Sequence, residues 1–477
     1  MLEKRNFYIN GKWVKPKNQK DIEVINPATE KSCAIISLGG KDDINDAVLA
    51  AKQAFKTWGF STKEDRIALL ENFYSLYKKR WNDITDAIIL EMGAPKDFAS
   101  KLQTGTGASH TKSFIRYLKE FEFEKTLGDH AKNQRILYEP KGICALITPW
   151  NWPMNQVCLK VIPALAAGCT MILKPSELAP LSSIVLAELI DEAKFPNGVF
   201  NLVNGDGATT GDALTSHPDV NMISFTGSTR AGALISQNAA KDFKRVSLEL
   251  GGKGANIIFK DADIEAIERG ALRCFRNSGQ SCNAPTRMLV EKPIYDEAVE
   301  RLKKYANDFK VDDPNKEGDH IGPVISETQF NKIQNLIQKG IDEGAKLVAG
   351  GPGKPNGIKD GYYIKPTVFA DVNNNMEIAR TEIFGPVLSV IPFETEEEAI
   401  EIANDTDYGL TNYIQTQDNK KVQRVARKLR SGMVDVNGAG IAVDAPFGGY
   451  KHSGIGREAG KEGLIEFLEL KSVGGWN

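Results

Sequence analysis

The chain has 477 residues, of which 60 are basic and 62 acidic, so its formal net charge is −2. This length exceeds what one hydrophobic core usually supports, and we expect two or three packed units. The charges are scattered and form no basic stripe, which gives no support to a nucleic-acid partner. No apolar run approaches the roughly 20 residues of a membrane helix, so we expect no membrane partner.

Cysteine and histidine usage bears on compartment and metals. The six cysteines have irregular spacings and include no C-x-x-C pair, which is typical of a reduced protein. The first residues, MLEKRNFYING, contain no continuous apolar core of a signal peptide. We therefore expect a cytoplasmic location. The five histidines are far apart in the sequence and predict no metal site.

The first 118 residues begin with a short strand region, FYINGKWV, at 7–14. Apolar residues then recur at helical spacing over 44–55, 66–77 and 84–92, which predicts three helices. Residues 119–140 alternate charged and apolar positions around a GDHAKN turn, which predicts a hairpin. A lone hairpin is marginally stable. We expect it to pack on another subunit with the strand-like C-terminal run LIEFLELKSVGG; the alternative is a hairpin folded on its own domain.

Short apolar runs alternate with helical segments between residues 141 and 259. The predicted strands include GICALIT, TMILKP, GVFNLV, VNMISFT and KRVSLEL, and the longer predicted helices include PMNQVCLKVIPALAAG and STRAGALISQNAA. This alternation predicts a parallel sheet covered on both faces, the doubly wound arrangement that binds nucleotides at the carboxyl ends of its strands. From about residue 251 the alternation restarts, with predicted strands GANIIF, RMLVEK, TVFADV and VLSVIPF, so we expect a second α/β unit.

A single cysteine, Cys282, lies in the polar segment RNSGQSCNAPTR, which predicts an exposed turn after a helix. A thiol becomes a nucleophile when backbone donors, a helix N-terminus or a nearby base lower its pKa. The other interpretation is a small packing residue, which fits Cys144, Cys158 and Cys169 in their apolar runs. The residues around Cys282 alone leave both interpretations open.

Two further polar side chains follow predicted strands. Glu249, in SLELGGK, alternates with Leu248 and Leu250, so it projects from the opposite face of its strand and could serve as a general base. Asn151, in PWNWP, lies where a helix begins, so its amide could stabilise negative charge. The alternatives are a solvated strand residue for Glu249 and a helix cap for Asn151.

Three strand ends suggest a nucleotide site. Glu177, in KPSE, follows the second strand of the unit, where an acidic residue usually binds the adenosine ribose. The glycines of NGDGATTG have a longer last gap than G-x-G-x-x-G and follow the third strand, so the standard fingerprint is absent. At the next junction, FTGSTRAG, Gly227 and Ser228 could cradle a pyrophosphate.

Together and in this order, these motifs resemble the aldehyde dehydrogenase superfamily. The resemblance covers essentially the whole chain through INGKWV, NPAT, PWNWP, KPSE, FTGST, LELGGK, GQSC, EIFGPV and PFGGYKHSGIGRE. It implies Cys282 as the nucleophile, Glu249 as the general base and Asn151, with the Cys282 amide, as oxyanion donors. Lys160 matches a family lysine near the active site.

The resemblance also implies NAD as the cofactor, with NADP as the alternative. The implied cofactor contacts are Ile147, Thr148, Pro149, Trp150, Lys174, Ser176, Glu177, Gly207, Gly211, Phe225, Gly227, Ser228, Leu250, Gly251, Glu382 and Phe384. We expect NAD over NADP because the Glu177 carboxylate would repel a 2′-phosphate.

The implied architecture has a Rossmann-type cofactor domain at 1–118 and 141–250, an α/β catalytic domain at 251–448, and a β-hairpin oligomerisation arm at 119–140 and 449–477. The implied reaction is oxidation of a small-molecule aldehyde to the acid through a covalent thioester on Cys282. Glu249 favours hydrolysis over transfer to coenzyme A, and an inactive structural or binding relative is the remaining alternative. We expect a homodimer or homotetramer.

Two departures from the family pattern concern the site. Ser281 and Asn283 flank Cys282 where many relatives have a second cysteine, so no disulfide can form between neighbours. The positions expected around the aldehyde are only partly aromatic, which does not resemble a cage for a quaternary ammonium group; they are Gln156, Leu159, Ile441 and Phe447.

Overall fold

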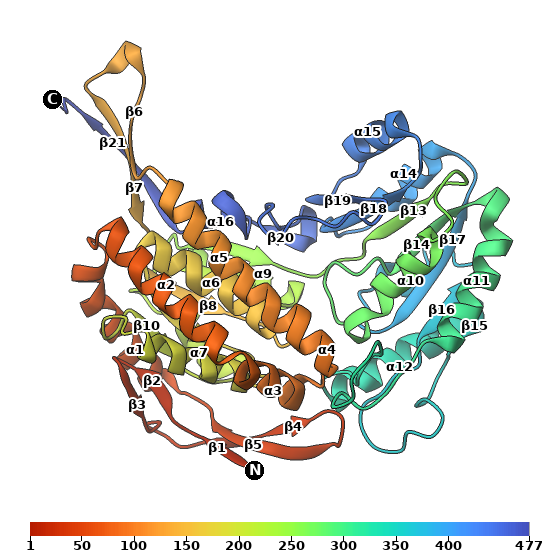
Figure 1. Cartoon of the computed structure of the whole chain (residues 1–477), viewed down its shortest axis with the longest axis horizontal. Coiled ribbons are helices and arrows are strands. Elements are labelled where there is room, and N and C mark those ends of the chain that lie inside the picture. The colour runs from red at the N-terminus through yellow and green to blue at the C-terminus, as the bar shows by residue number, and fades with distance from the viewer. Residues whose placement is uncertain (477) are drawn as a thin grey trace.

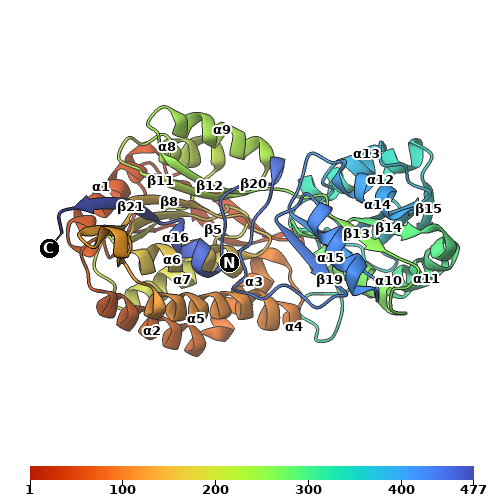
Figure 2. The same ribbon diagram turned by 90° about the horizontal axis from the view of Figure 1, so that it is seen from above.

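Two α/β bodies lie side by side in the computed structural model, which describes residues 1–476, and a thin β-sheet arm projects from the first body (Figure 1). Seen from above, the sheet of the first body lies between two layers of helices (Figure 2). The predicted α/β fold class is confirmed.

The first body is built on an eight-stranded sheet whose five central strands are parallel. Its order is β20 (Gly454–Ile455), β12 (Arg245–Glu249), β11 (Met222–Thr226), β8 (Ile143–Ile147), β9 (Thr170–Lys174), β10 (Phe200–Leu202), β2 (Phe7–Ile9) and β3 (Lys12–Val14). The strand order reverses between β8 and β11. In a doubly wound sheet, such a switch point opens a crevice at the carboxyl ends of the strands.

Both faces of this sheet are buried at its centre because the central strands carry apolar residues on both faces. On β8, Ile143, Ala145 and Ile147 pack on one face, and Cys144 and Leu146 pack on the other. The first face is covered by α1 (Lys41–Trp58), α8 (Asp212–Thr215) and α9 (Thr229–Ala240). The second is covered by α2 (Lys63–Lys79), α3 (Trp81–Met92), α5 (Gly105–Glu120), α6 (Pro153–Ala167), α7 (Leu181–Glu192) and α16 (Gly460–Ile465).

The second body has a seven-stranded sheet that is parallel except for one edge strand. Its order is β15 (Lys346–Ala349), β16 (Thr367–Ala370), β17 (Val387–Phe393), β14 (Arg287–Glu291), β13 (Ala255–Ile258), β18 (Thr411–Gln415) and β19 (Met433–Val436). One face packs on α10 (Ala266–Phe275) and α11 (Tyr295–Asp308). The other packs on α12 (Glu327–Asp342), α13 (Glu377–Arg380), α14 (Glu396–Asn404) and α15 (Asn419–Lys428).

The arm contains both segments that the sequence analysis assigned to it, but their strand pairing was not predicted. The hairpin strands β6 (Glu124–Thr126) and β7 (Gln134–Pro140) pair as expected, but β21 (Leu468–Gly474) also pairs along the full length of β7. Strands β7 and β21 lie more than 300 residues apart in the sequence, and local alternation carries no information on a pairing over that distance. The arm is therefore a three-stranded sheet that leaves the body together with the C-terminus (Figure 1).

Other elements complete the fold. The helices predicted in the first hundred residues are confirmed as α1, α2 and α3, but the sequence did not predict the small sheet of β1 (Leu2–Lys4), β5 (Lys31–Ser37) and β4 (Asp21–Asn26). Short turns of helix are α4 (Lys96–Phe98), η1 (Ala99–Thr104), η2 (Asp129–Ala131), η3 (Gly207–Gly211), η4 (Arg276–Gly279), η5 (Lys292–Ile294) and η6 (Lys451–Ser453). Within residues 1–476, no helix has both the length and the apolar character needed to cross a bilayer.

Candidate active site

The Cys282 loop is packed between the two bodies, and the prediction of an exposed turn is wrong. Asn277, Ser278 and Gln280 are buried, and Cys282 is half-buried. The polar side chains face protein partners in place of water: Ser278 Oγ donates to Gly322 O at 2.8 Å, and Gln280 Nε2 donates to Asn277 O at 3.1 Å. A polar sequence can therefore form a buried turn when its own hydrogen bonds satisfy it.

Backbone strain holds this loop in one shape. Asn277 and Ser278 both have φ of 56°, in the left-handed region that side chains other than glycine disfavour. Gly279 follows with φ of 73°, and a Cβ there would lie 2.0 Å from the carbonyl carbon of Gly385. Only glycine fits at this position. The strained turn directs the chain so that Cys282 reaches the junction of two cavities.

The first of these, which we call the strand-end cavity, has a volume of about 230 Å³ and lies at the carboxyl ends of β8, β11 and β12. The second, the helix cavity, has a volume of about 280 Å³ and is walled mainly by α5, α6, α10 and the loop at 441–447. Cys282 lines both cavities. A ligand in either cavity can therefore contact this residue.

The strand-end cavity brings together eleven of the residues selected from the sequence. They are Pro149, Trp150, Asn151, Gly227, Ser228, Glu249, Leu250, Gly251, Cys282, Glu382 and Phe384. Because β8 and β11 are neighbours at the switch point, segments far apart in the chain meet at one sheet edge. Thr226, Gln329 and Lys332 also line this cavity, and the sequence reasoning did not select them.

Asn151 is held rigidly beside the Cys282 loop. Its Nδ2 donates to Gln280 O at 2.9 Å, and its own carbonyl accepts from Asn277 Nδ2 at 3.0 Å and Gln103 Nε2 at 3.1 Å. The side chain is buried. The cap interpretation does not describe it, because its amide bonds to another loop and not to the first turn of α6. Gln103, Asn277 and Gln280 are supporting residues that the sequence reasoning missed.

Glu249 ends β12 as a buried carboxylate. Leu248 packs in the apolar cluster on one face of the sheet, so Glu249 projects from the other face, as predicted. Neither carboxylate oxygen has a hydrogen-bond partner among the described residues. Burial, reinforced by the nearby Glu458 carboxylate, raises the pKa of Glu249 well above its usual value. Gly448 leaves room for the carboxylate, since a Cβ there would lie 2.7 Å from Glu249 Oε1.

Lys160 lies behind this carboxylate and not on either cavity wall. It is completely buried on α6, donates to Thr226 Oγ1 at 2.7 Å, and forms an ion pair with Glu458. Glu458 is the last residue of the GIGRE motif. Because it lies far from Lys160 in the chain, the sequence gave no reason to pair the two residues. The pair places one charge of each sign near Glu249, and the two act on its carboxylate in opposite directions.

The environment of Cys282 disfavours the thiolate form. Burial raises the pKa of Cys282, and the carboxylates of Glu382, Glu249 and Glu458 raise it further. The neighbouring Ser281 hydroxyl accepts from Trp152 Nε1 at 2.9 Å. Activation of the thiol therefore requires a base or a positive charge next to it.

Glu382 and Phe384 close the far side of the strand-end cavity. Glu382 Oε1 accepts from Gly252 N at 2.9 Å, and a Cβ on Gly251 would lie 2.5 Å from Glu382 Oε2, so only glycine admits this carboxylate. The ring of Phe384 meets Trp150 edge to face, with centroids 5.4 Å apart. Together they form a polar and an aromatic wall opposite Cys282.

The remaining predicted cofactor residues do not line the strand-end cavity. Lys174 is buried at the end of β9, where its Nζ donates to Gly205 O at 2.6 Å and to Pro175 O at 3.1 Å, 3.8 Å from Glu177 Oε2. Burial lowers the pKa of Lys174. The others in this outer group are Ile147, Thr148, Ser176, Glu177, Gly207, Gly211 and Phe225. They follow or flank β8, β9, β10 and β11, along the same edge of the sheet.

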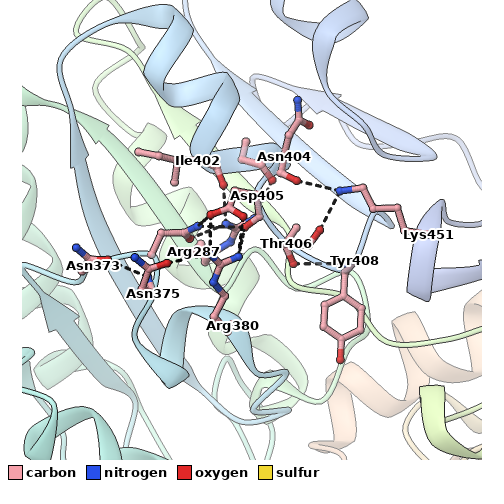
Figure 3. Close-up of polar contacts among 12 residues, drawn as sticks. Arg287, Asn373, Asn375, Arg380, Ile402, Asn404, Asp405, Thr406, Tyr408 and Lys451 are labelled. Carbon is pink, nitrogen blue, oxygen red and sulfur yellow. Dashed lines mark hydrogen bonds and ion pairs between the residues drawn. The ribbon is translucent and has the colours of Figure 1, made fainter.

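Arg287, the last residue of the Cys282 loop, anchors that loop in the second body (Figure 3). Arg287, the first residue of β14, is completely buried and donates to Asn374 Oδ1, Ile402 O and Ala403 O at 2.8 to 2.9 Å. Its Nε donates to Lys253 O at 3.1 Å, in the segment after Glu249. Arg287 thus ties the Cys282 and Glu249 segments to one rigid support.

Among residues 1–476, no three His, Cys, Asp or Glu side chains gather as metal ligands would.

Comparison with known proteins agrees with this architecture. The model of a protein family described as "Aldehyde dehydrogenase family" matches residues 13–473. A Pseudomonas protein named 3-succinoylsemialdehyde-pyridine dehydrogenase is 50% identical over 478 residues, covering 100% of this chain and 99% of the relative. A crystal structure of aldehyde dehydrogenase from Bartonella henselae superimposes with a TM-score of 0.99 at 57% identity, covering 100% of both chains.

A second solved structure is aldehyde dehydrogenase C from Pseudomonas syringae, a cysteine-to-alanine mutant in complex with NAD+ and octanal. It superimposes with a TM-score of 0.97 at 46% identity, covering 99% of this chain and 97% of that one. The family model and both measures of similarity extend over nearly the full length. The chain belongs to the aldehyde dehydrogenase family.

Proposed function

We propose that this aldehyde dehydrogenase oxidises an aldehyde to the carboxylic acid with NAD+ and water, through a covalent thioester on Cys282. The observation that carries the proposal is the position of Cys282 on both cavities, with Asn151 and Glu249 on the wall of one of them. One cavity can then hold the redox cofactor and the other the aldehyde, with the nucleophile between them.

The strand-end cavity fits the nicotinamide end of a dinucleotide. Helix α9 begins at Ser228, and its N-terminus offers backbone donors to a pyrophosphate. Glu382, Phe384 and Trp150 offer a carboxylate and two aromatic faces beside Cys282. NAD+ is present in the solved complex of the Pseudomonas syringae relative. When bound, NAD+ supplies a nicotinamide ring that accepts a hydride.

Cys282 acts first in the proposed reaction. Its sulfur attacks the aldehyde carbon as the thiolate, after the thiol proton has passed to water. The new C–S bond leaves a negative oxygen, which the Asn151 amide and the Cys282 backbone N–H stabilise. Each such donor contributes about 3 to 4 kcal/mol in the transition state. Loss of hydride from the same carbon turns the adduct into a thioester.

Glu249 then supports hydrolysis. Its unpartnered carboxylate accepts a proton from a water molecule, which attacks the thioester, breaks the C–S bond and releases the acid and the Cys282 thiol. The Lys160 ammonium favours the charged form of this carboxylate, whereas the Glu458 carboxylate disfavours it. A coenzyme A-dependent enzyme would not need this base, which favours hydrolysis over acyl transfer.

Incubation of the purified protein with NAD+ and a panel of aldehydes tests the proposal. We expect formation of NADH together with the matching carboxylic acid, and none from the Cys282→Ala protein. If NADH formed only when coenzyme A was added, acyl transfer would replace hydrolysis. If neither condition gave NADH, an inactive binding relative would be the better description.

We also propose NAD+ in preference to NADP+, because the partly exposed Glu177 carboxylate lies at the end of β9. The positive charge of Lys174 could attract a 2′-phosphate and so offset the repulsion by Glu177. This effect is reduced because the Lys174 ammonium already donates to two carbonyl groups. In Glu177→Gln, we expect the ratio of kcat/KM with NADP+ to that with NAD+ to rise about tenfold. An unchanged ratio would place the ribose elsewhere.

Three features of organisation remain proposals. The first body would bind the cofactor, the second would supply the nucleophile, and the arm would join subunits into a homodimer or homotetramer. The arm supports this because its edges are open and Leu470 is 66% exposed on β21. Light scattering on the full chain and on Leu470→Lys tests it.

The cysteine usage supports a cytoplasmic location.

A further inference from the structure

Residues 441–447, which we call the cavity loop, lie between β19 and η6 and form part of the wall of the helix cavity. Five of them line that cavity: Ile441, Ala442, Val443, Ala445 and Phe447. The other two positions expected around the aldehyde, Gln156 and Leu159, also line it, from α6. Ala442 and Val443 are at the same time exposed to solvent. The cavity loop therefore separates part of the helix cavity from the outside of the protein.

The chain on both sides of the cavity loop is fixed by backbone hydrogen bonds. Before it, Asn437 N donates to a carbonyl group of β18 at 2.8 Å. At its end, Phe447 and Glu458 exchange two backbone hydrogen bonds of 2.7 and 2.8 Å. For residues 441–446, the described part of the chain offers hydrogen-bond partners outside this stretch to Asp444 alone. The polar attachment of the middle of the loop thus depends on one side chain.

Asp444 does not line either cavity and binds to α5 instead. Its Oδ2 accepts from the Tyr117 hydroxyl at 3.3 Å, and the carboxylate forms an ion pair with Arg116. The guanidinium carbon of Arg116 lies 4.8 Å from the centre of the Tyr117 ring, so the two partners of Asp444 also contact each other. The backbone is close to α16 here, since a Cβ on Gly460 would lie 2.3 Å from Asp444 O.

Helix α5 supports both the cavity and the loop. Thr106 and His110 line the helix cavity, and Tyr117 binds Asp444. Their spacings of four and seven residues place all three on one face of the helix. The His110 ring bonds to Asn155 Oδ1 of α6 at 2.8 Å, which fixes the two helices to each other. Asp444 therefore sets the position of the cavity loop relative to the rest of the cavity wall.

The ion pair is partly exposed, which limits its strength. The side chain of Arg116 is 53% exposed and that of Asp444 is 25% exposed. The guanidinium lowers the pKa of Asp444, so the carboxylate is charged at neutral pH. Pairs of this kind contribute modestly to stability and are weakened by salt. A modest attachment is sufficient here, because the loop is already fixed at both ends.

We propose that Asp444 is a positioning residue that determines which aldehydes are accepted, by holding the cavity loop on α5 as a binding surface for the apolar tail of the aldehyde. The side chains that this surface offers are Ile441, Val443 and Phe447. A loop that is ordered beforehand binds a tail without a further loss of conformational entropy. The inference rests on the proposed oxidation at Cys282, because that residue places the aldehyde group in the same cavity.

A series of straight-chain aldehydes from acetaldehyde to heptanal tests the proposal in wild type and in Asp444→Asn. A loop that is in place for only part of the time lowers the apparent affinity by that fraction. We expect KM for heptanal to rise about fivefold in the variant, and KM for acetaldehyde, whose tail is too short to gain from the loop, to stay within about twofold. The kcat values should not change, because Asn151 and Glu249 line the other cavity.

Salt and a second variant separate the ion pair from a general loss of structure. Added sodium chloride should raise KM for heptanal in wild type toward the value of Asp444→Asn, and should leave KM of that variant unchanged. Arg116→Met should have the same effect as Asp444→Asn. The double variant Arg116→Met/Asp444→Asn should be no more impaired than either single variant, because the two residues act as a pair.

Glu71→Gln is the matched control. Glu71 Oε1 lies 2.6 Å from Lys119 Nζ, so this substitution also removes an exposed ion pair of α5, but one that does not involve the cavity loop. We expect wild-type KM values along the whole series. Hydrogen exchange of the peptide that contains residues 437–447 gives a readout independent of activity. It should be faster in Asp444→Asn than in wild type and unchanged in Glu71→Gln.

The outcomes separate this inference from the proposed function. An equal rise in KM for acetaldehyde and heptanal, or no rise for either, would overturn the role of Asp444 while the oxidation itself stands. Faster hydrogen exchange with unchanged KM values would do the same. If the wild-type protein oxidised no member of the series and formed no adduct on Cys282, the proposed function would fail, and this inference with it.

Discussion

The two cavities that meet at Cys282 differ in the origin of their walls. The strand-end cavity is formed mainly by residues at the ends of parallel strands, and Asn151 and Glu249 line this cavity but not the other. The helix cavity collects side chains from Thr106 to Ala459, on helices, strands and loops of both bodies. From this difference we infer that the first cavity determines the reaction and the second the choice of aldehyde. Changes on the first side should affect all aldehydes equally.

The largest expected effect is that of Glu249→Gln. Without a base for hydrolysis, we expect kcat to fall about a thousandfold, while the first turnover still releases one NADH per active site. The factor should be the same for alkyl, aryl and carboxylate-bearing aldehydes, because Glu249 does not line the helix cavity. Stopped-flow measurement of NADH gives the burst and the steady state. Undiminished steady-state turnover would remove Glu249 from its role.

Replacement of Lys160 by Met tests the support behind the strand-end cavity. The substitution leaves the buried Glu458 carboxylate without its charge partner. We therefore expect the free energy of unfolding to decrease by about 3 to 5 kcal/mol. The double variant Lys160→Met/Glu458→Gln should recover most of this loss. Urea unfolding of the three proteins measures both effects. A single variant as stable as wild type would mean that the pair contributes little.

Asn151→Ala should lower kcat/KM about a hundredfold to a thousandfold for every aldehyde, since it removes one oxyanion donor. Asn151→Asp is a useful control, because it keeps the size of the side chain but replaces the donor with a negative charge. We expect it to be at least as impaired. A loss that depended strongly on the aldehyde would instead place Asn151 among the residues that select the substrate.

The pH dependence of kcat should show the raised pKa of Glu249. The carboxylate is a base only when it has lost its proton, so kcat should fall about tenfold per pH unit below that pKa and level off above it. The fall in kcat should begin at a pH well above the usual pKa of a glutamate, and it should begin at the same pH for different aldehydes. A flat profile, or limbs that shift with the aldehyde, would contradict the division between the cavities.

Local patterns placed two residues of the strand-end cavity correctly. Glu249 follows Leu248 in a pattern of period two at the end of β12, and Asn151 lies between β8 and the start of α6, as the strand-to-helix junction predicted. Local patterns failed where contacts are long-range. The buried state of the Cys282 turn depends on packing between two bodies, and the pairing of β21 with β7 joins the end of the chain to its middle.

The helix cavity shows the same limit. Arg273 looks like an ordinary helix residue in the sequence, and its contacts with Asp435 and Tyr413, which lie more than 100 residues away on two strands, appear only in the fold. Glu458 likewise acquires its partner Lys160 only through the fold. Motifs therefore indicated which residues gather around Cys282, whereas these long-range contacts required the arrangement of side chains in space.

The central claim is that the Cys282 sulfur carries the substrate carbon. The most direct test mixes Glu249→Gln with NAD+ and an aldehyde and measures the mass of the protein and of its peptides. We expect one acyl group per chain, located on the peptide that contains Cys282, and no acyl group when Cys282→Ala is added to the same variant. An acyl group on another residue, or full aldehyde oxidation by Cys282→Ala alone, would contradict the account.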